Sequence, residues 1–224
     1  MKSTLFKLTS PIFELVDSEY QLFDEIYSIP TLPAYAFLNH NILRTNTVVA
    51  ELDHIPDYEL LDNTLRVKRI CPGVQGEIRI CLLTLHYAAI RDYRLLFPHI
   101  NDQDLKQRLG HFAEEADNAF ESGAWMSFTI MAISVVEGIL FNIFGNKKLV
   151  DLINEANSYT IIDNVEKDLL HNARQVRNRI HAGQFKEPLA DRCFSTDLYV
   201  LYDQLVKKDW IKLKECIGSS ALMT

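Results

Sequence analysis

The sequence has few of the residues that interrupt helices or cross-link chains. Its 224 residues include 8 Gly, 7 Pro and 4 Cys, whereas hydrophobic residues make up 48%. The low Gly and Pro contents argue against a collagen-like or low-complexity chain. The hydrophobic content is too high for wholesale disorder and is sufficient for a sizeable core. Helix-compatible residues dominate, and we therefore expect an all-α fold.

The four cysteines form no recognisable metal or redox motif. They stand at positions 71, 81, 193 and 216, without a CxxC and without a Cys/His pair at zinc spacing. No signal peptide is visible at MKSTLFKLTS, the first ten residues. We therefore expect reduced thiols in a cytoplasmic protein, with no bound metal and no cofactor.

Several catalytic signatures are also missing from the sequence. It contains no Gly-rich P-loop, no GxSxG and no HExxH. The formal net charge is -7, which disfavours a surface that is coated by nucleic acid throughout. Because salt limits the reach of distant carboxylates to about 8–10 Å, a local basic cleft remains compatible with this charge.

Residues 1–100 are predicted to form a mainly helical N-terminal region of unknown role. Apolar residues recur every three or four positions in 11–28 and again in 75–97, which Pro98 ends. Between these segments, 34–53 fits either a helix or a strand, and LRVKRI at 65–70 alternates like a short strand. This region contains no catalytic pattern, and by elimination it is the expected carrier of specificity.

Residues 101–224 are predicted to form a bundle of four to five helices with short connections. The segment 124–144 is long and apolar enough to span a membrane, and Glu137 is its only charged residue. Glu137 would be costly in lipid, and we expect a buried core helix and no membrane association. Asp163 is the expected N-cap of the next-to-last helix. The other expected helices are 104–122, 147–156 and 188–207.

One short segment, 171–186, concentrates positive charge in this acidic protein. Its sequence, HNARQVRNRIHAGQFK, contains no acidic residue. If it is helical, one face over two turns presents, at i, i+3, i+4 and i+7, Arg174, Arg177, Asn178 and His181. Gly183 would then follow as the C-cap. Guanidinium, amide and imidazole groups at one helix end suit a phosphodiester, although a solvated face and a helix-dipole partner are alternatives.

The second block of the chain resembles a HEPN domain over roughly residues 102–214. The resemblance rests on three segments: FAEEADNAFESGAWMSFTIMAISVVEGIL, KKLVDLINEANS with the isoleucine pair after it, and ARQVRNRIHAG. Together they resemble the family's paired helices, its short connecting helix and its Arg-polar-to-His signature. The resemblance implies a homodimer whose composite cleft is a metal-independent endoribonuclease, in a toxin–antitoxin or phage-defence setting with an antitoxin or regulatory partner.

The resemblance also implies roles for particular residues toward RNA. The predicted catalytic residues are Arg174, Arg177, Asn178 and His181. Arg179 and Lys186 are predicted to bind phosphate, and Glu137 to support the site by pairing with Arg174 or Arg177. An imidazole can transfer the proton of a ribose hydroxyl, and a guanidinium can neutralise the scissile phosphate.

The spacing of this segment departs from the family's pattern, in which Arg and a polar residue are most often followed by three further residues and then His. Only two residues separate Asn178 from His181, whereas six separate Arg174 from His181. Since each residue turns a helix by about 100°, either Arg174 takes the phosphate role or the site is geometrically altered. A non-catalytic HEPN module that binds RNA, a nucleotide or a partner protein is therefore the alternative function, and a purely structural scaffold is a third.

Overall fold

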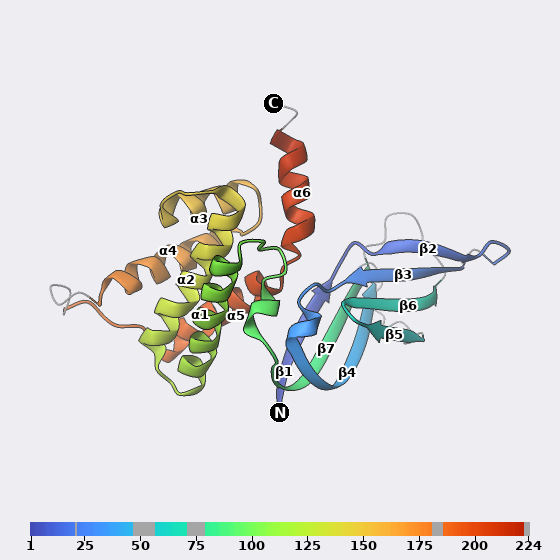
Figure 1. The fold of residues 1–224 in the computed structure, drawn as a ribbon, viewed down its shortest axis with the longest axis horizontal. Helices are drawn as coiled ribbons and strands as arrows, with labels where there is room; N and C mark the ends of the chain where they lie inside the picture. Colours follow the sequence, from blue (N-terminus) through green and yellow to red (C-terminus); the bar gives the residue numbers. More distant parts are fainter. Residues whose placement is uncertain (21, 47–56, 71–78, 181–185, 222–224) are drawn as a thin grey trace. The chain divides into compact units, whose positions relative to one another are not determined.

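The computed structural model describes residues 1–20, 22–46, 57–70, 79–180 and 186–221. The chain divides into two compact units, Met1–Asp92 and Tyr93–Thr224, where we expected a boundary at residue 100. Strands dominate the first unit, the sheet unit, and helices form the second, the helical unit (Figure 1). The fold is therefore α/β, and the all-α prediction with a mainly helical N-terminal region is wrong.

The sheet unit contains two antiparallel sheets. One has the strand order β1-β7-β4, and the other has the order β2-β3-β6-β5. Their elements are β1 (Lys2–Leu8), β2 (Ile12–Asp17), β3 (Leu22–Ser28), η1 (Leu32–Ala34), β4 (Tyr35–Asn46), β5 (Tyr58–Leu61), β6 (Thr64–Ile70) and β7 (Arg79–Ile90). The strand predicted at 65–70 is confirmed by β6, and β4 takes the strand alternative for the described part of 34–53.

β7 replaces most of the helix predicted at 75–97. Its buried side chains alternate along the strand, with Leu83 and Leu85 both 0% exposed. Leu83 pairs with Phe6 of β1 on one side and with Ile42 of β4 on the other, which gives a buried row across the sheet. Apolar residues also occupy many of the intervening positions of RICLLTLHYAAI, so that the sequence matched a helical period as well as an alternating one.

The helix predicted at 11–28 is also wrong, because this segment is the β2–β3 hairpin. Asp17 divides it: its Oδ1 accepts hydrogen bonds from the backbone N–H groups of Glu19, at 2.9 Å, and Tyr20, at 3.1 Å. An aspartate that bonds the backbone two and three residues on stabilises a turn in place of a helix. The apolar residues on either side of the turn then pair across two strands.

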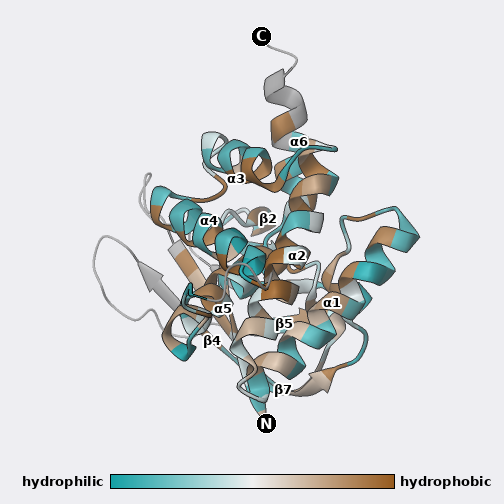
Figure 2. Ribbon diagram, turned by 90° about the vertical axis from the view of Figure 1, so that its left-hand side faces the viewer, coloured by the Kyte–Doolittle hydropathy of each residue, from teal (hydrophilic) through white to brown (hydrophobic). Residues whose placement is uncertain are grey.

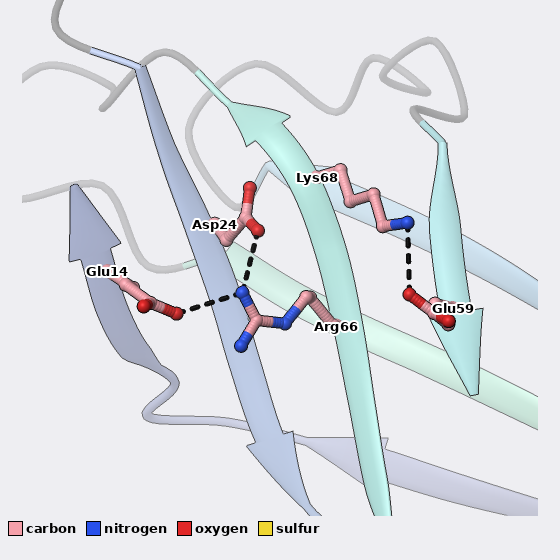
Figure 3. A network of polar contacts seen from close by, with 5 residues as sticks. All are labelled: Glu14, Asp24, Glu59, Arg66 and Lys68. Carbon is pink, nitrogen blue, oxygen red and sulfur yellow. Dashed lines mark hydrogen bonds and ion pairs between the residues drawn. The ribbon is translucent and has the colours of Figure 1, made fainter. Parts of the chain in front are cut away.

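Charged side chains form a network on one face of the second sheet (Figure 3). Arg66 of β6 lies between two carboxylates, with Nη1 2.8 Å from Glu14 Oε2 and 3.0 Å from Asp24 Oδ2. On the other side of β6, Lys68 Nζ lies 3.0 Å from Glu59 Oε2 of β5. Neighbouring strands thus present opposite charges to each other, as is favourable across a sheet.

The helical unit is built around α2. Its elements are η2 (Tyr93–Leu96), α1 (Gln103–Glu121), α2 (Trp125–Phe144), α3 (Leu149–Ser158), α4 (Asn164–Asn178), α5 (Arg192–Lys207) and α6 (Trp210–Ala221). Helix α2 contacts α1, α3, α4 and α5. The helices predicted at 104–122, 124–144 and 147–156 are confirmed by α1, α2 and α3, whereas α6 is an additional helix that the sequence pattern did not indicate.

Helix α2 has the hydrophobic character of a core element. Figure 2 shows it mainly at the hydrophobic end of the scale, whereas α4 is largely hydrophilic on its visible side. Among the described residues it is the one helix long and apolar enough to cross a membrane. Its buried side chains, which include Phe128, Ile133 and Ile139, pack within the helical unit, as expected for a core helix.

The two helices α1 and α2 approach closely at Gly138. A Cβ atom at this position would lie 2.4 Å from Cδ2 of Leu109, a side chain that is only 1% exposed. Glycine in a helix interior costs about 1 kcal/mol relative to alanine. Here the missing side chain is what allows Leu109 to pack against the α2 backbone.

Candidate functional site

Helix α4 carries the described part of the predicted site. Asp163 is its N-cap and forms a capping box with Glu166: Asp163 Oδ1 accepts from the Glu166 N–H, and Glu166 Oε2 accepts from the Asp163 N–H, both at 2.8 Å. The predicted N-cap is therefore confirmed. The buried residues Leu170, Ala173 and Val176 form the core-facing side and leave the polar side chains to one flank of the helix.

Helix α4 ends earlier than we predicted. Its last residue is Asn178, and the N–H of the C-cap Arg179 donates to the Val176 carbonyl at 2.9 Å, which tightens the final turn. The prediction of one helix that continues through His181 is therefore wrong, because residues 179 and 180 form a turn, while the C-cap at Gly183 stays a prediction. His181 and Gly183 lie outside the described part of the chain. The structure brings Arg174, Arg177 and Asn178 together on consecutive turns of α4.

The predicted pairing of Glu137 with an arginine of this segment is confirmed. Arg177 Nη1 donates to Glu137 Oε2 at 2.7 Å, and the side chains of Arg177 and Glu137 are 27% and 36% exposed. A lone carboxylate on an apolar helix needs such a partner, because desolvation penalises an unpaired charge. The ion pair joins α2 to α4 and fixes the direction of the guanidinium, which retains N–H donors for a further ligand.

Arg174 lies one turn before Arg177, and its side chain has different surroundings. Its side chain is half-buried, and its Nε is a buried donor for which the described residues provide no acceptor. Buried donors in proteins are nearly always hydrogen-bonded. Because Nε is buried, only the part of the half-buried guanidinium that remains exposed can donate to an anion from solvent.

His171 belongs to the same flank of α4, although no sequence pattern assigned it a role. Its Nε2 lies 3.3 Å from Oδ1 of Asn154 on α3. Burial lowers the pKa of His171, the Arg174 and Lys167 charges lower it further, and Asp168 opposes them. The imidazole is therefore neutral at neutral pH, with Nε2 the natural place for its proton. Its position three residues before Arg174 is the signal that could have identified it.

The two residues predicted to bind phosphate outside the helix differ in their surroundings. Arg179 Nη1 donates to the carbonyl oxygen of Pro188 at 2.7 Å, which ties the end of α4 to the segment that leads into α5. Lys186 is exposed. Of these two, Arg179 has a structural role in the described geometry, whereas Lys186 lies where an anion from solvent can reach it.

Other potential sites lie away from α4. Among the described ranges, no group of three His, Cys, Asp or Glu side chains could hold a metal ion. A hollow of about 430 Å³ lies between the chain before α1 and helix α6. Its lining residues are Pro98, His99, Asn101, Ile211, Lys214 and Glu215.

Comparisons of this chain with protein-family models, with curated proteins and with solved structures find no match. The resemblance to the HEPN family therefore stays a prediction, based on the sequence segments given above.

Proposed function

We propose that the helical unit is a metal-independent endoribonuclease of the HEPN type. The observation that carries this proposal is the ion pair between Glu137 on α2 and Arg177 on α4. It lies between the two helices that resemble the family's signature elements. It also holds one guanidinium in a fixed direction beside Arg174, so that two cations are available on one flank.

The proposed reaction uses the ribose of the substrate as the nucleophile. The 2′-oxygen forms a bond to phosphorus while the bond from phosphorus to the 5′-oxygen breaks, which gives a 2′,3′-cyclic phosphate and a 5′-hydroxyl. His181 accepts the proton of the 2′-hydroxyl as general base, the leaving 5′-oxygen takes a proton from water, and the hydroxide so formed takes the proton back from His181. Arg174 and Arg177 neutralise the charge that develops on the phosphoryl oxygens, and Asn178 orients the phosphate.

The wider setting rests on the same resemblance. A homodimer would place two copies of α4 at one composite cleft, and an antitoxin or regulatory protein would hold the activity in check. The half-buried arginines support the RNA-binding part of the proposal alone, because an RNA backbone is bound mainly through guanidinium and ammonium groups.

The end of α4 at Asn178 favours a second candidate function. Helix α4 carries Arg174, Arg177 and Asn178, whereas His181 lies outside the described residues, so that the described geometry provides cations for binding without a general base. A HEPN-like module that binds RNA, a nucleotide or a partner protein through Arg174, Arg177 and Lys186 without cutting would need no general base.

The first test is cleavage of a mixed RNA pool in EDTA by the full chain. For a ribonuclease we expect His181→Ala to lower the cleavage rate by about 10²–10⁴-fold, the usual contribution of a general base. His111→Ala, which removes an exposed imidazole from α1, is the matched control and should leave the rate unchanged. Products ending in a 2′,3′-cyclic phosphate would identify the proposed reaction.

Binding measurements separate the two candidate functions. If neither the native protein nor His181→Ala cuts RNA, but both bind it and Arg174→Ala with Arg177→Ala does not, the protein is the binding module. Arg108→Ala, an exposed arginine of α1, is the control for loss of charge alone. Absence of both cleavage and binding would overturn the proposal in both forms.

The role of Glu137 has its own test. Glu137→Gln removes the charge that directs Arg177, and we expect cleavage to fall by about tenfold to a hundredfold as the guanidinium loses its position. Glu115→Gln changes an exposed carboxylate on α1 and should have no effect. An unchanged rate in Glu137→Gln would show that the ion pair serves stability alone.

A further inference from the structure

Helix α4 carries an imidazole, His171, on the flank that holds its arginines. His171 Nε2 lies 3.3 Å from Oδ1 of Asn154 on α3. Since an amide oxygen only accepts, Nε2 carries the proton of the neutral ring, and Nδ1 keeps a lone pair that can accept a hydrogen bond. His171 Nδ1 is buried, and the described residues provide no donor for it. Buried acceptors without a donor are rare in folded proteins.

The next turn of α4 carries the complementary group. Arg174 Nε is a buried donor for which the described part of the chain has no acceptor. Side chains three positions apart are neighbours on a helix surface. Burial is the main cause of the lowered pKa of His171, and the charge of Arg174 lies close enough to lower it further. One flank of α4 thus places an acceptor that lacks a donor next to a donor that lacks an acceptor.

The two arginines of this flank also differ in how their charges are balanced. Arg177 Nη1 lies 2.7 Å from Glu137 Oε2, so that its charge is compensated within the protein. Among the residues that the structure describes, no carboxylate forms an ion pair with Arg174. A neutral imidazole can direct a guanidinium without reducing its charge. Of the two arginines, Arg174 therefore attracts a phosphate more strongly.

We propose that Arg174 is the principal arginine that binds the phosphate of the RNA, and that His171 is its positioning residue. When the phosphate binds, His171 Nδ1 accepts a hydrogen bond from the Nε–H of Arg174, while Asn154 holds the ring through Nε2. The Nη groups of Arg174 are then left to donate to the phosphate. This role of His171 rests on the RNA-directed function proposed above, and it leaves Arg177 as the arginine that joins α4 to α2.

The test compares two substitutions of the same shape at position 171. His171→Asn places an acceptor, Oδ1, where the ring has Nδ1, whereas His171→Leu places a methyl group there. Both remove the contact of Nε2 with Asn154, so that the acceptor alone distinguishes them. The probe is a short single-stranded 2′-O-methyl RNA, which lacks the attacking hydroxyl and is therefore bound without being cut.

The expected result is a difference in RNA affinity between these two variants. His171→Asn should bind the probe within about threefold of the native protein. His171→Leu should bind it about tenfold more weakly than His171→Asn, as expected for the loss of a hydrogen bond to a charged group. Urea unfolding of both variants, read by tryptophan fluorescence, shows that the affinities compare folded proteins.

Double substitutions connect the effect to Arg174. In combination with Arg174→Ala, His171→Asn and His171→Leu should bind the probe equally, because the donor is gone. In combination with Arg177→Ala, the difference of about tenfold should persist. The pairing is thus assigned to one of the two arginines.

Nitrogen NMR of the native protein gives a measurement that needs no substitution. At neutral pH, the nitrogen chemical shifts of His171 should show a protonated Nε2 and an unprotonated Nδ1. The Nε–H proton of Arg174 should exchange with water more slowly once the probe RNA is bound, because it is then held in a hydrogen bond.

The results that would overturn the inference differ from those that would overturn the proposed function. If the native protein binds the probe, equal affinities of His171→Asn and His171→Leu would exclude a role for the acceptor. A difference that survives Arg174→Ala would assign the acceptor to another donor, and a proton on Nδ1 would exclude the hydrogen bond. If the native protein binds no RNA, the proposed function fails, and the role of His171 fails with it.

Discussion

The sheet unit and the helical unit place their basic side chains in different surroundings. In the sheet unit, the side chains of Arg66 and Lys68 are 38% and 42% exposed; Glu59, the partner of Lys68, is 52% exposed, whereas Asp24, one of the two partners of Arg66, is 9% exposed. In the helical unit, the side chains of Arg177 and Lys207 are 27% and 7% exposed. The ion pair of Lys68 in the sheet unit thus lies largely in solvent, whereas those of Arg177 and Lys207 in the helical unit are more buried.

This difference indicates which ion pairs contribute most to the stability of the folded protein. A surface pair contributes little, because water and salt screen it. Breaking a buried pair is costly, because the charged group that remains is then buried with neither an ionic partner nor water around it. Arg177 and Lys207 also lie at the C-terminal ends of α4 and α5, where a cation is favoured by the helix dipole. We therefore expect substitution of a basic residue to have a large effect where its ion pair is buried, as at Lys207, and a small effect where the pair is exposed, as at Lys68.

The largest expected effect is that of Lys207→Ala. Lys207 Nζ donates to Asp203 Oδ2; burial lowers the pKa of Lys207, and the carboxylate opposes this shift. The substitution leaves Asp203 without its partner and should lower the free energy of unfolding by about 3 kcal/mol. Urea unfolding read by tryptophan fluorescence reports this unit alone, because both tryptophans, Trp125 and Trp210, belong to it.

The control for this prediction is a more exposed ion pair of the same unit. Lys147 pairs with Glu155, and their side chains are 43% and 26% exposed. Lys147→Ala should change the free energy of unfolding by less than about 1 kcal/mol. Equal effects of the two substitutions would break the comparison, since burial would then not determine the contribution of the pair.

The next effect is a dependence of stability on pH that arises from His99. Its side chain is 7% exposed and packs beside Trp210, with ring centroids 5.9 Å apart. Burial lowers its pKa from 6.5 to about 4, and the charges of Lys214 and Lys106 add to the shift. The folded state therefore binds this proton less readily than the unfolded state.

The sign and the pH range of this dependence follow from those two pKa values. The stabilisation is fully present above pH 6.5 and is lost as the pH falls to about 4, by a total on the order of 3 kcal/mol. Unfolding curves between these pH values should show the loss in the native protein and a weaker one in His99→Asn. His111→Asn, at an exposed position, should keep the native slope. His171, whose pKa burial also lowers, accounts for part of the remaining slope.

The smallest effect belongs to the sheet unit. Lys68→Ala removes a pair with Glu59 in which both side chains are about half exposed, at 42% and 52%. The free energy of unfolding should change by about 0.5 kcal/mol or less. The measurement is pulsed alkylation of Cys81, a buried thiol on β7 that reacts only when the sheet unit opens. Mass spectrometry of the labelled peptide distinguishes Cys81 from the other cysteines. A loss above about 2 kcal/mol would contradict the distinction between the two units.

The helical unit could be predicted from sequence to a large extent because its signals are local. Asp163 with Glu166 marks the start of α4, and the apolar period of α1 and α2 is uninterrupted over many turns. The ion pair of Glu137 could be predicted because a lone carboxylate on an apolar helix is costly unless it pairs with a cation, and the arginines of 171–186 were the expected partners. The early end of α4 could not be predicted. There, Arg179 donates a hydrogen bond to the backbone carbonyl of Pro188, and this contact depends on the tertiary structure.

The sheet unit could not be predicted from the same kind of pattern. In 11–28, the spacing of Ile12, Leu15 and Val16 matches one face of a helix. The sequence pattern therefore predicted a helix and gave no sign of the turn that Asp17 forms. In β7, the buried residues alternate, but apolar residues lie at the other positions too, so that the period does not distinguish strand from helix. Pairing with β1 and β4 decides between them, and such contacts are distant in sequence.

The close approach of α1 and α2 at Gly138 has a consequence for the evolution of the protein. Gly138 neighbours Glu137, so a side chain there would shift α2 against Leu109 and carry the partner of Arg177 with it. If the proposed RNA-directed activity is correct, selection for it would then act on a residue outside the predicted site. Among sequences that drift apart, glycine at this position should persist together with the acidic residue before it, and the two should be lost together.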